Sequence, residues 1–433
     1  MLKEALTDVG PLIKLYRIKS GLTQEELSEG ICTPSYLSRI ENSHVIADIE
    51  IHQLLFQRMN IDFNDFYEES INMDSKLESI YMNLLSNKTP NDENDENYKL
   101  LEDSTKYIFK KELHLKAKLV FSRYLISLKR YKEAKVIIDE IGEVIQLSGD
   151  RNTFIYINVA ISLYYLTNQQ KKANELSKQA ATIRDFLDNG SSFELGCYYY
   201  NLALLLCKEY KYLETIEHCQ KALNYFTDIY QPNLDFKCHI LLGVAKNNLA
   251  QYNLAKRHYK ICLNILQNIE KLSIPSNFNM VYSNLGYCYD CQGDINKAIY
   301  YYTKAFDYSQ GISDYINLIR THYQADNIDS ALKYLNTVLL IDEIISPKYQ
   351  YQIDILSFIL LGNLDTQTAE NINALEERSL SYFKEEKFHT LTIFYSKLFA
   401  QFYKKLNWYK KTSELLEIAL EISESLRKGG QVE

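Results

Sequence analysis

The sequence predicts an all-α fold in which a small helical domain precedes a long array of helix pairs. Among 433 residues only 14 are Gly and 6 are Pro, which is too few turn formers for a many-stranded fold. No segment alternates for long between apolar and polar residues, as a half-buried strand would. Apolar residues instead recur at helical spacing along most of the chain.

Composition excludes several classes of function. The net charge of −8 argues against indiscriminate nucleic-acid binding through a basic surface, but it allows a local DNA-reading face. No basic and apolar leader looks like a signal peptide, and no apolar run approaches the ~18 residues of a membrane span, so we expect a cytoplasmic protein without membrane contact. Cys288 and Cys291 have no second pair at metal spacing. We therefore expect reduced thiols, no metal and no cofactor.

The N-terminal residues predict a helix-turn-helix. Thr23 and Glu26 form a capping box for a short helix, and a further helix over 34–42 follows a tight turn. Two short helices across such a turn, flanked by a preceding helix, are typical of a DNA-binding motif. Beyond it, we expect Leu54 and Leu55 to face the core of this domain.

The stretch 279–307 predicts two antiparallel helices in close contact. Gly286 and Ala298 are small enough to let the helix backbones approach, and Gly293 with Asp294 supplies the turn. The spacing resembles a tetratricopeptide repeat, and the resemblance implies a right-handed α-solenoid of roughly eight repeats. The small residue of the second helix recurs through the chain, at Ala134, Ala173, Thr215, Ala255, Ala298, Ala331 and Thr412.

These patterns divide the chain into three parts. We expect a helix-turn-helix domain over 1–70, a linker over 71–97 and a repeat domain over 98–433. The linker is predicted to hold a separate helix over 75–85 and a polar loop over 87–97 that lacks apolar residues. The last helix has an apolar face for capping or dimerisation, formed by Leu415, Leu416, Ala419 and Ile422.

The run LTQEELSEGICTPSYLSRIEN, residues 22–42, resembles the DNA-binding domain of phage-repressor-type regulators. More narrowly, it resembles the amino-terminal domain of the RRNPP peptide-pheromone regulators of Gram-positive bacteria, in which a helix-turn-helix precedes a tetratricopeptide array. The resemblance implies that Arg17 pairs with Glu41 and that both are structural.

The resemblance also implies a DNA-reading surface at the start of the third helix. Gln24 is expected to bind a phosphate, and Arg39 is the best candidate for contacting guanine. The implied DNA-binding residues are Gln24, Thr33, Ser35, Tyr36, Ser38, Arg39 and Asn42. Residues 1–70 nevertheless hold six basic and twelve acidic side chains, so phosphate affinity is expected to be modest. The alternative is a helix-turn-helix retained only for folding or partner binding.

Asparagine recurs at one position of the first helix in several repeats. Asn201, Asn284 and Asn317 each precede the small residue of their repeat by the same interval, and Asn158 stands one residue earlier. An amide both donates and accepts, so a row of Asn suits an extended peptide on a concave surface, as the family resemblance implies. The alternative is that Asn fills solvated positions in an Asn-rich chain. The other predicted lining residues are Arg123, Tyr165, Asn247, Tyr287 and Arg320.

We therefore expect a quorum-sensing transcription regulator. A short signalling peptide would bind the concave groove and reset the spacing of two helix-turn-helix domains in a homodimer on a pseudo-palindromic double-stranded operator. The alternative is a peptide-controlled scaffold that binds a response regulator or a kinase without binding DNA. No phosphate loop, nucleophile elbow or His-rich metal spacing favours an enzyme. The sequence does not specify the peptide, the operator or the sign of regulation.

Overall fold

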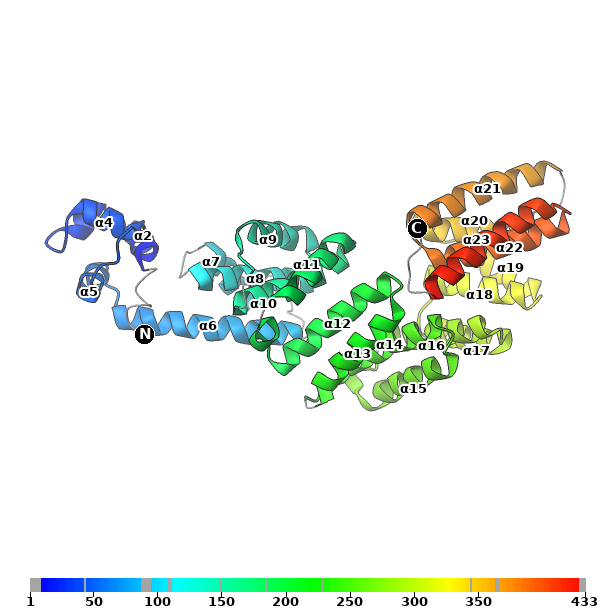
Figure 1. Ribbon diagram of the computed structural model, residues 1–433, viewed down its shortest axis with the longest axis horizontal. Helices are drawn as coiled ribbons and strands as arrows, with labels where there is room; N and C mark the ends of the chain where they lie inside the picture. Colours follow the sequence, from blue (N-terminus) through cyan, green and yellow to red (C-terminus); the bar gives the residue numbers. More distant parts are fainter. Residues whose placement is uncertain are drawn as a thin grey trace. The chain divides into compact units, whose positions relative to one another are not determined.

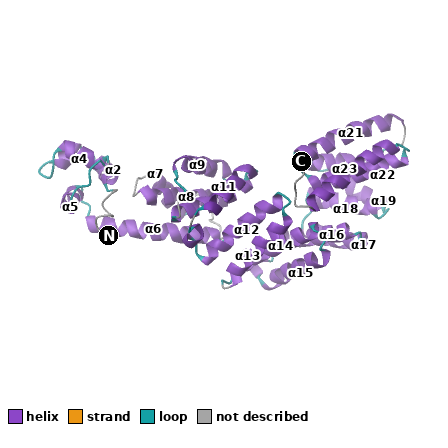
Figure 2. Ribbon diagram, viewed as in Figure 1, coloured by secondary structure: helices purple, strands orange, loops and turns teal. Residues whose placement is uncertain are grey.

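The computed structural model describes residues 9–42, 44–86, 95–106, 111–147, 150–183, 185–227, 229–342, 345–362 and 366–427. Within these ranges every regular element is a helix, as Figure 2 shows, which confirms the expected all-α fold. The contacts divide the chain into two compact units, residues 1–201 and residues 202–433.

The N-terminal helices follow the predicted start and stop signals. They are α2 (Gly10–Lys19), α3 (Gln24–Ser28), α4 (Pro34–Glu41) and α5 (Ile49–Arg58). The capping box is present, because the Thr23 hydroxyl accepts from the Glu26 amide at 3.2 Å and the Glu26 carboxylate accepts from the Thr23 amide at 2.7 Å. Gly30, in the turn between α3 and α4, has a φ of 70°, which glycine adopts without strain.

The core of these helices differs from the prediction at one residue. Leu55 is fully buried as expected, but Leu54 is 47% exposed, so its predicted inward orientation is wrong. His52, Phe56 and Met59 are buried with Leu55. At helical spacing these residues form one stripe, which places Leu54 on the outer side of α5.

A single long helix, α6 (Phe63–Leu85), includes the shorter helix that we predicted over 75–85. The prediction of a separate helix over 75–85 is wrong, because residues 68–74 contain no Gly or Pro that would interrupt the helix. Of the predicted polar loop, residues 87–94 lie outside the described residues. Its last residues already belong to α7 (Glu96–Lys106).

Sixteen further helices follow in sequence, and they are labelled in Figure 1. They are α8 (Lys111–Ser127), α9 (Tyr131–Val144), α10 (Arg151–Leu166), α11 (Gln170–Thr182), α12 (Ser192–Lys208), α13 (Tyr212–Thr227), α14 (Pro232–Asn248), α15 (Tyr252–Asn268), α16 (Pro275–Gln292), α17 (Ile295–Tyr308), α18 (Ile312–Gln324), α19 (Ile328–Val338), α20 (Pro347–Leu361), α21 (Thr366–Glu385), α22 (His389–Lys405) and α23 (Tyr409–Arg427). In the described residues the two helices of seven successive pairs contact each other, close to the roughly eight repeats predicted; these pairs are α8–α9, α10–α11, α14–α15, α16–α17, α18–α19, α20–α21 and α22–α23.

The small residues predicted in seven of the second helices are buried. The residues at these positions are at most 9% exposed: Ala134, Ala173, Thr215, Ala255, Ala298, Ala331 and Thr412. In the pair α16–α17, Gly286 approaches the Tyr302 ring so closely that a Cβ atom there would lie 2.7 Å from a ring carbon. Gly293 ends α16 with a φ of 84°, and the Asp294 carboxylate caps α17.

The last helix has its apolar residues on two faces instead of one. In α23, Leu415, Ala419 and Ile422 are buried, but Leu416 is 46% exposed, so its predicted place on the same face is wrong. The buried residues follow the i, i+4, i+7 spacing of one stripe, and Leu416 is rotated out of that stripe. Leu420, one turn beyond Leu416, is exposed beside it.

We expect Gly286→Val to destabilise the α16–α17 pair by about 1–3 kcal/mol, because the added side chain would overlap the buried Tyr302 ring. Hydrogen exchange over residues 275–308 in the full chain measures this loss. The matched control is Ser276→Val at an exposed position of the same helix. Equal protection in the two variants would contradict the close-approach argument.

Candidate functional site

The predicted recognition helix, α4, presents polar side chains at its start. The Thr33 hydroxyl caps the helix by accepting from the Tyr36 amide at 3.2 Å. Thr33, Ser35 and Arg39 are exposed, whereas Tyr36 and Ser38 are partly buried. At the end of the helix the exposed Asn42 donates from its amide nitrogen to the Ser38 carbonyl at 2.8 Å. This surface therefore presents hydroxyl groups and one guanidinium to solvent.

The inner side of α4 is fixed by Glu41. Its carboxylate accepts from the Arg17 Nε at 2.6 Å and the Arg17 Nη2 at 3.1 Å, which confirms the implied pair. It also accepts from the Gln24 amide nitrogen at 2.7 Å, a contact that we did not predict. Since Glu41 is only 2% exposed, three donors from α2 and α3 converge on one buried carboxylate. The Gln24 amide nitrogen, which we expected at a phosphate, is used inside the domain.

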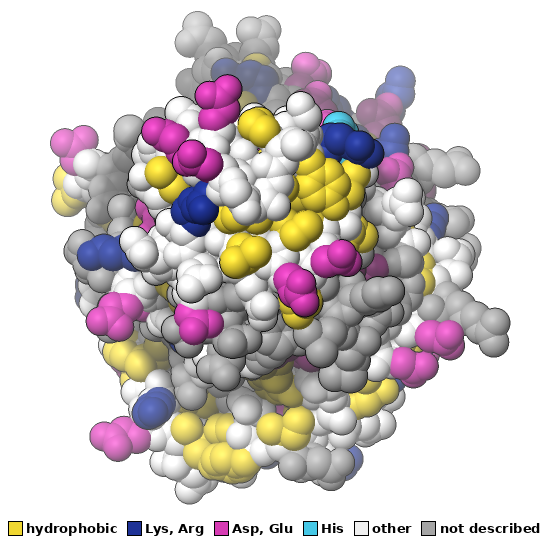
Figure 3. Space-filling model, turned by 90° about the vertical axis from the view of Figure 1, so that its left-hand side faces the viewer, with side chains coloured by type: hydrophobic (Ala, Val, Ile, Leu, Met, Phe, Trp, Pro, Cys, Tyr) yellow, Lys and Arg dark blue, Asp and Glu magenta, His cyan; other side chains and the backbone are white. Residues whose placement is uncertain are grey.

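Few of the positive charges described in this domain are available to phosphates. Arg58 donates to the backbone carbonyls of Glu26, Leu27 and Glu29, so its guanidinium holds the end of α3. Arg39 is exposed on α4 and makes no described ion pair. In the view of Figure 3, the described Lys and Arg side chains stand singly among acidic ones and form no continuous basic patch. The geometry favours specific contacts over phosphate attraction.

In the first unit, two of the predicted lining residues contact each other. The Asn201 amide nitrogen on α12 donates to the Asn158 side-chain oxygen on α10 at 2.9 Å. Asn158 is 2% exposed, and its own amide nitrogen has no hydrogen-bond partner among the described residues. Tyr165 is half-buried near the end of α10. The Asn158 amide nitrogen is therefore a buried donor without an acceptor.

Arg123 on α8 is the other predicted residue of the first unit. Its Nη2 donates to the Leu84 carbonyl at the end of α6, at 3.4 Å. Its Nε is shielded from solvent and has no described partner. Burial lowers the pKa of Arg123.

In the second unit, Asn247 on α14 is also incompletely bonded. It is 4% exposed, its amide nitrogen lies 3.8 Å from the Cys291 sulfur, and its side-chain oxygen has no described partner. Asn284 is half-buried, and its amide nitrogen donates to the Met280 carbonyl one turn earlier. Tyr287 and Asn317 are half-buried on α16 and α18. The recurring Asn positions therefore do not share one hydrogen-bonding environment.

We expected Arg320 to be available to the carboxylate of a ligand, but it already forms an ion pair with the Asp290 carboxylate. Its Nη2 lies 2.6 Å from the Asp290 carboxylate and 3.2 Å from the Tyr302 hydroxyl, and its guanidinium lies 4.7 Å from the centre of the Phe394 ring. Sequence analysis missed Asp290. The available signal was its spacing, because Asp290 precedes Ala298 by the eight residues that separate Asn247 from Ala255.

The two cysteines of the C-x-x-C pattern face different partners. The Cys288 thiol donates to the Tyr252 carbonyl at 3.7 Å, whereas Cys291 lies next to Asn247 and Tyr287. Burial raises the pKa of Cys288 to about 11, which keeps it protonated at neutral pH. None of the helices in the described ranges is long and apolar enough to cross a membrane.

We expect Glu41→Gln to lower the free energy of unfolding of the N-terminal domain by about 3–5 kcal/mol, because Arg17 would lose its anionic partner in a buried site. Hydrogen exchange over residues 13–59 in the full chain measures the change. Glu50→Gln, at an exposed position of α5, is the control with the same loss of charge. An unchanged exchange rate in Glu41→Gln would contradict a structural role for the pair.

Comparison with known proteins agrees with this architecture. Residues 13–66 match the helix-turn-helix family model. The transcriptional activator NprA of Geobacillus stearothermophilus is 24% identical over 414 residues, which are 92% of this chain and 99% of that protein. A crystal structure of NprR in complex with its cognate peptide NprX has a TM-score of 0.59 and 17% identity, over 81% of this chain and 99% of that one. A Rap protein complexed with competence and sporulation factor has a TM-score of 0.67 and 14% identity, over 83% of this chain and 99% of that one. Residues 13–66 therefore form a helix-turn-helix domain, and the chain shares the fold of the NprR and Rap structures.

Proposed function

We propose that this chain is a quorum-sensing transcription regulator whose DNA binding is controlled by a short signalling peptide. The proposal rests on two buried side-chain amides that each have an atom without a described hydrogen-bond partner. Asn158 has a nitrogen and Asn247 an oxygen without a described partner, and native structures rarely leave such groups unpaired. A peptide backbone supplies both an acceptor and a donor, so it suits an unpaired amide of either kind.

The proposal assigns DNA reading to residues 1–70 and ligand binding to 98–433, with 71–97 joining them. The exposed start of α4 is the proposed base-reading surface, and Arg39 is its guanidinium. That NprA is a transcriptional activator and that NprR was solved with a cognate peptide support this assignment. We further propose a homodimer on a pseudo-palindromic double-stranded operator, because two linked domains would compensate for the weak phosphate attraction of an acidic domain.

Control by a peptide requires a difference in affinity. A ligand shifts an equilibrium only as far as it binds one conformation better than another. The peptide must therefore favour one arrangement of the array, and the linked helix-turn-helix domains must differ in DNA affinity between arrangements. Whether the peptide increases or decreases DNA binding depends on which arrangement of the array binds DNA better.

A second candidate function is a peptide-controlled scaffold that binds a response regulator or a kinase. The fold shared with the Rap protein favours it. The two functions differ in the use of α4, because a scaffold does not need an exposed guanidinium aimed at DNA. Neither function gives this chain a catalytic role.

We expect Arg39→Ala to weaken binding to the protein's own promoter region by about 10- to 100-fold, because a guanidinium that contacts guanine contributes about 1–3 kcal/mol. Binding at fixed salt to the promoter and to unrelated DNA measures the specific part. Lys132→Ala removes one exposed charge on α9 and serves as the control. No binding of the wild-type chain to its promoter, with peptide binding intact, would favour the scaffold.

We expect Asn158→Ala to weaken binding of short peptides encoded next to the gene by about tenfold, because one buried donor to the peptide backbone is lost. Calorimetry with each synthetic peptide measures the affinity. The control is Asn268→Ala at an exposed position on α15. Equal affinities for the two variants would remove Asn158 from the site.

A further inference from the structure

Tyr210 is an aromatic residue at a turn position where the backbone is left-handed. It follows α12 with a φ of 62°, a region in which a bulky side chain is strained. Its amide donates to the carbonyl three residues earlier, and the same hydrogen bond and a positive φ recur in the turns of other helix pairs. Those turns have Lys129, Asn168, Ala250, Gly293 and Asp326 at this position. Such strain persists only where other contacts of the residue compensate for it.

The side chain of Tyr210 contacts the turn between α21 and α22. Its hydroxyl donates to the Lys387 carbonyl at 2.7 Å, across 177 residues of sequence. Its ring centre lies 4.7 Å from that of His389, with the two ring planes at 60°. Both turns belong to the second unit. We call this contact, formed by Tyr210, Lys387 and His389, the clasp.

The clasp joins the two ends of a segment that carries the predicted lining residues of the second unit. Helices α13 to α21 lie between the two turns along the chain. In an array each helix packs mainly on its neighbours, so small rotations at successive pairs add up. A contact between the two ends limits the sum of these rotations. The lining residues on this segment are Asn247, Asn284, Tyr287, Asn317 and Arg320.

Helix α22 connects the clasp with the lining. His389 is its first residue, and Phe394 on the same helix lies 4.7 Å from the Arg320 guanidinium, measured to the ring centre. Arg320 in turn binds the Asp290 carboxylate at 2.6 Å. A movement of α22 at the clasp therefore changes the surroundings of a lining residue through a single helix.

We propose that the clasp holds the second unit in the arrangement that presents its peptide-binding side chains, and that a bound peptide strengthens the clasp in return. The inference rests on the proposed function, because it takes the ligand to be a peptide. In this structure the clasp is formed and the Asn247 side-chain oxygen is buried without a described partner. A peptide that pairs this oxygen binds best to the clasped arrangement, and the coupling acts equally in both directions.

The experiment uses the full chain with three substitutions. Tyr210→Phe removes only the hydroxyl. Tyr210→Asn also removes the ring, and it places at the turn a residue that tolerates a positive φ, so the turn itself is kept while the clasp opens. Tyr230→Phe, at a position of the same unit that is 80% exposed, is the matched control for the loss of a hydroxyl.

Hydrogen exchange at residues 384–392 measures the opening of the clasp. We expect exchange there to be about two- to tenfold faster in Tyr210→Phe than in the wild-type chain, because one hydrogen bond is lost. Exchange should be faster still in Tyr210→Asn, which also loses the ring contact with His389. Tyr230→Phe should exchange like the wild-type chain.

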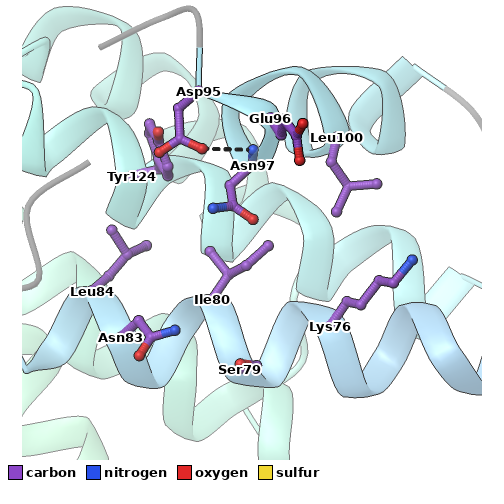
Figure 4. A pocket seen from close by; sticks show the side chains of 10 residues that line it. All are labelled: Lys76, Ser79, Ile80, Asn83, Leu84, Asp95, Glu96, Asn97, Leu100 and Tyr124. Atoms are coloured by element: carbon purple, nitrogen blue, oxygen red, sulfur yellow. Dashed lines mark hydrogen bonds between the residues drawn. The ribbon is translucent and has the colours of Figure 1, made fainter. Parts of the chain in front are cut away.

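The lining of a cavity in the first unit supplies the internal reference. The cavity, of about 520 Å³, lies between α6 and α7, and Figure 4 shows Ile80 and Leu84 projecting into it. A loosely packed segment loses protection early when a whole chain is destabilised. Unchanged exchange at residues 76–84 therefore confines the effect of the substitutions to the second unit.

Calorimetry with synthetic peptides encoded next to the gene measures the coupling to the ligand. We expect Tyr210→Asn to bind about five- to tenfold more weakly than the wild-type chain, because its array spends less time in the clasped arrangement. The peptide should also slow exchange at residues 384–392 of the wild-type chain by a similar factor. Tyr230→Phe should keep the wild-type affinity.

Three results would overturn the proposed clasp and leave the proposed function intact. They are equal exchange at residues 384–392 in Tyr210→Asn and the wild-type chain, a rise in exchange that is as large at residues 76–84, and equal peptide affinities of the two chains. A wild-type chain that binds none of the peptides would instead overturn the proposed function, and the coupling with it.

Discussion

The structure depends on the close approach of two helices at one small residue. Where Gly286 meets the Tyr302 ring no larger side chain fits, so steric exclusion constrains the crossing of α16 and α17, and Ala298 on α17 is fully buried. The same type of contact recurs along the array at buried Ala and Thr. Because the crossing is fixed, the remaining side chains of the first helices are held at repeated positions. The polar lining is a consequence of that packing.

The N-terminal domain is organised by charge as well as by packing. Its helices are short, and Glu41 joins three of them through Arg17 and Gln24. A buried carboxylate with three donors specifies the orientation of α4 more narrowly than apolar contacts do, because each hydrogen bond fixes a direction. The orientation of the exposed start of α4 is therefore determined by the Glu41 contacts on the buried side of the helix.

The sequence was sufficient where local rules decide the structure. The capping box at Thr23 and the small residues of the helix pairs depend only on nearby residues or on a repeated interval. The sequence was insufficient to decide which of two adjacent apolar residues faces the core, as Leu54 and Leu416 show. Neighbouring positions are separated by only ~100° around a helix. The partners Asp290 and Gln24 were missed because contacts between helices depend on register, which periodicity does not specify.

The incompletely bonded groups are the least expected feature of a stable array. Asn158, Asn247 and Arg123 each keep a buried polar atom without a described partner, although the fold satisfies a comparable buried group at Glu41. An unpaired buried polar atom costs about 1–3 kcal/mol, and total stability is only about 5–15 kcal/mol. Local departures of this kind are expected where a site awaits a ligand. A ligand that pairs such an atom gains free energy only in the arrangement that presents it, and this difference in affinity is what regulation requires.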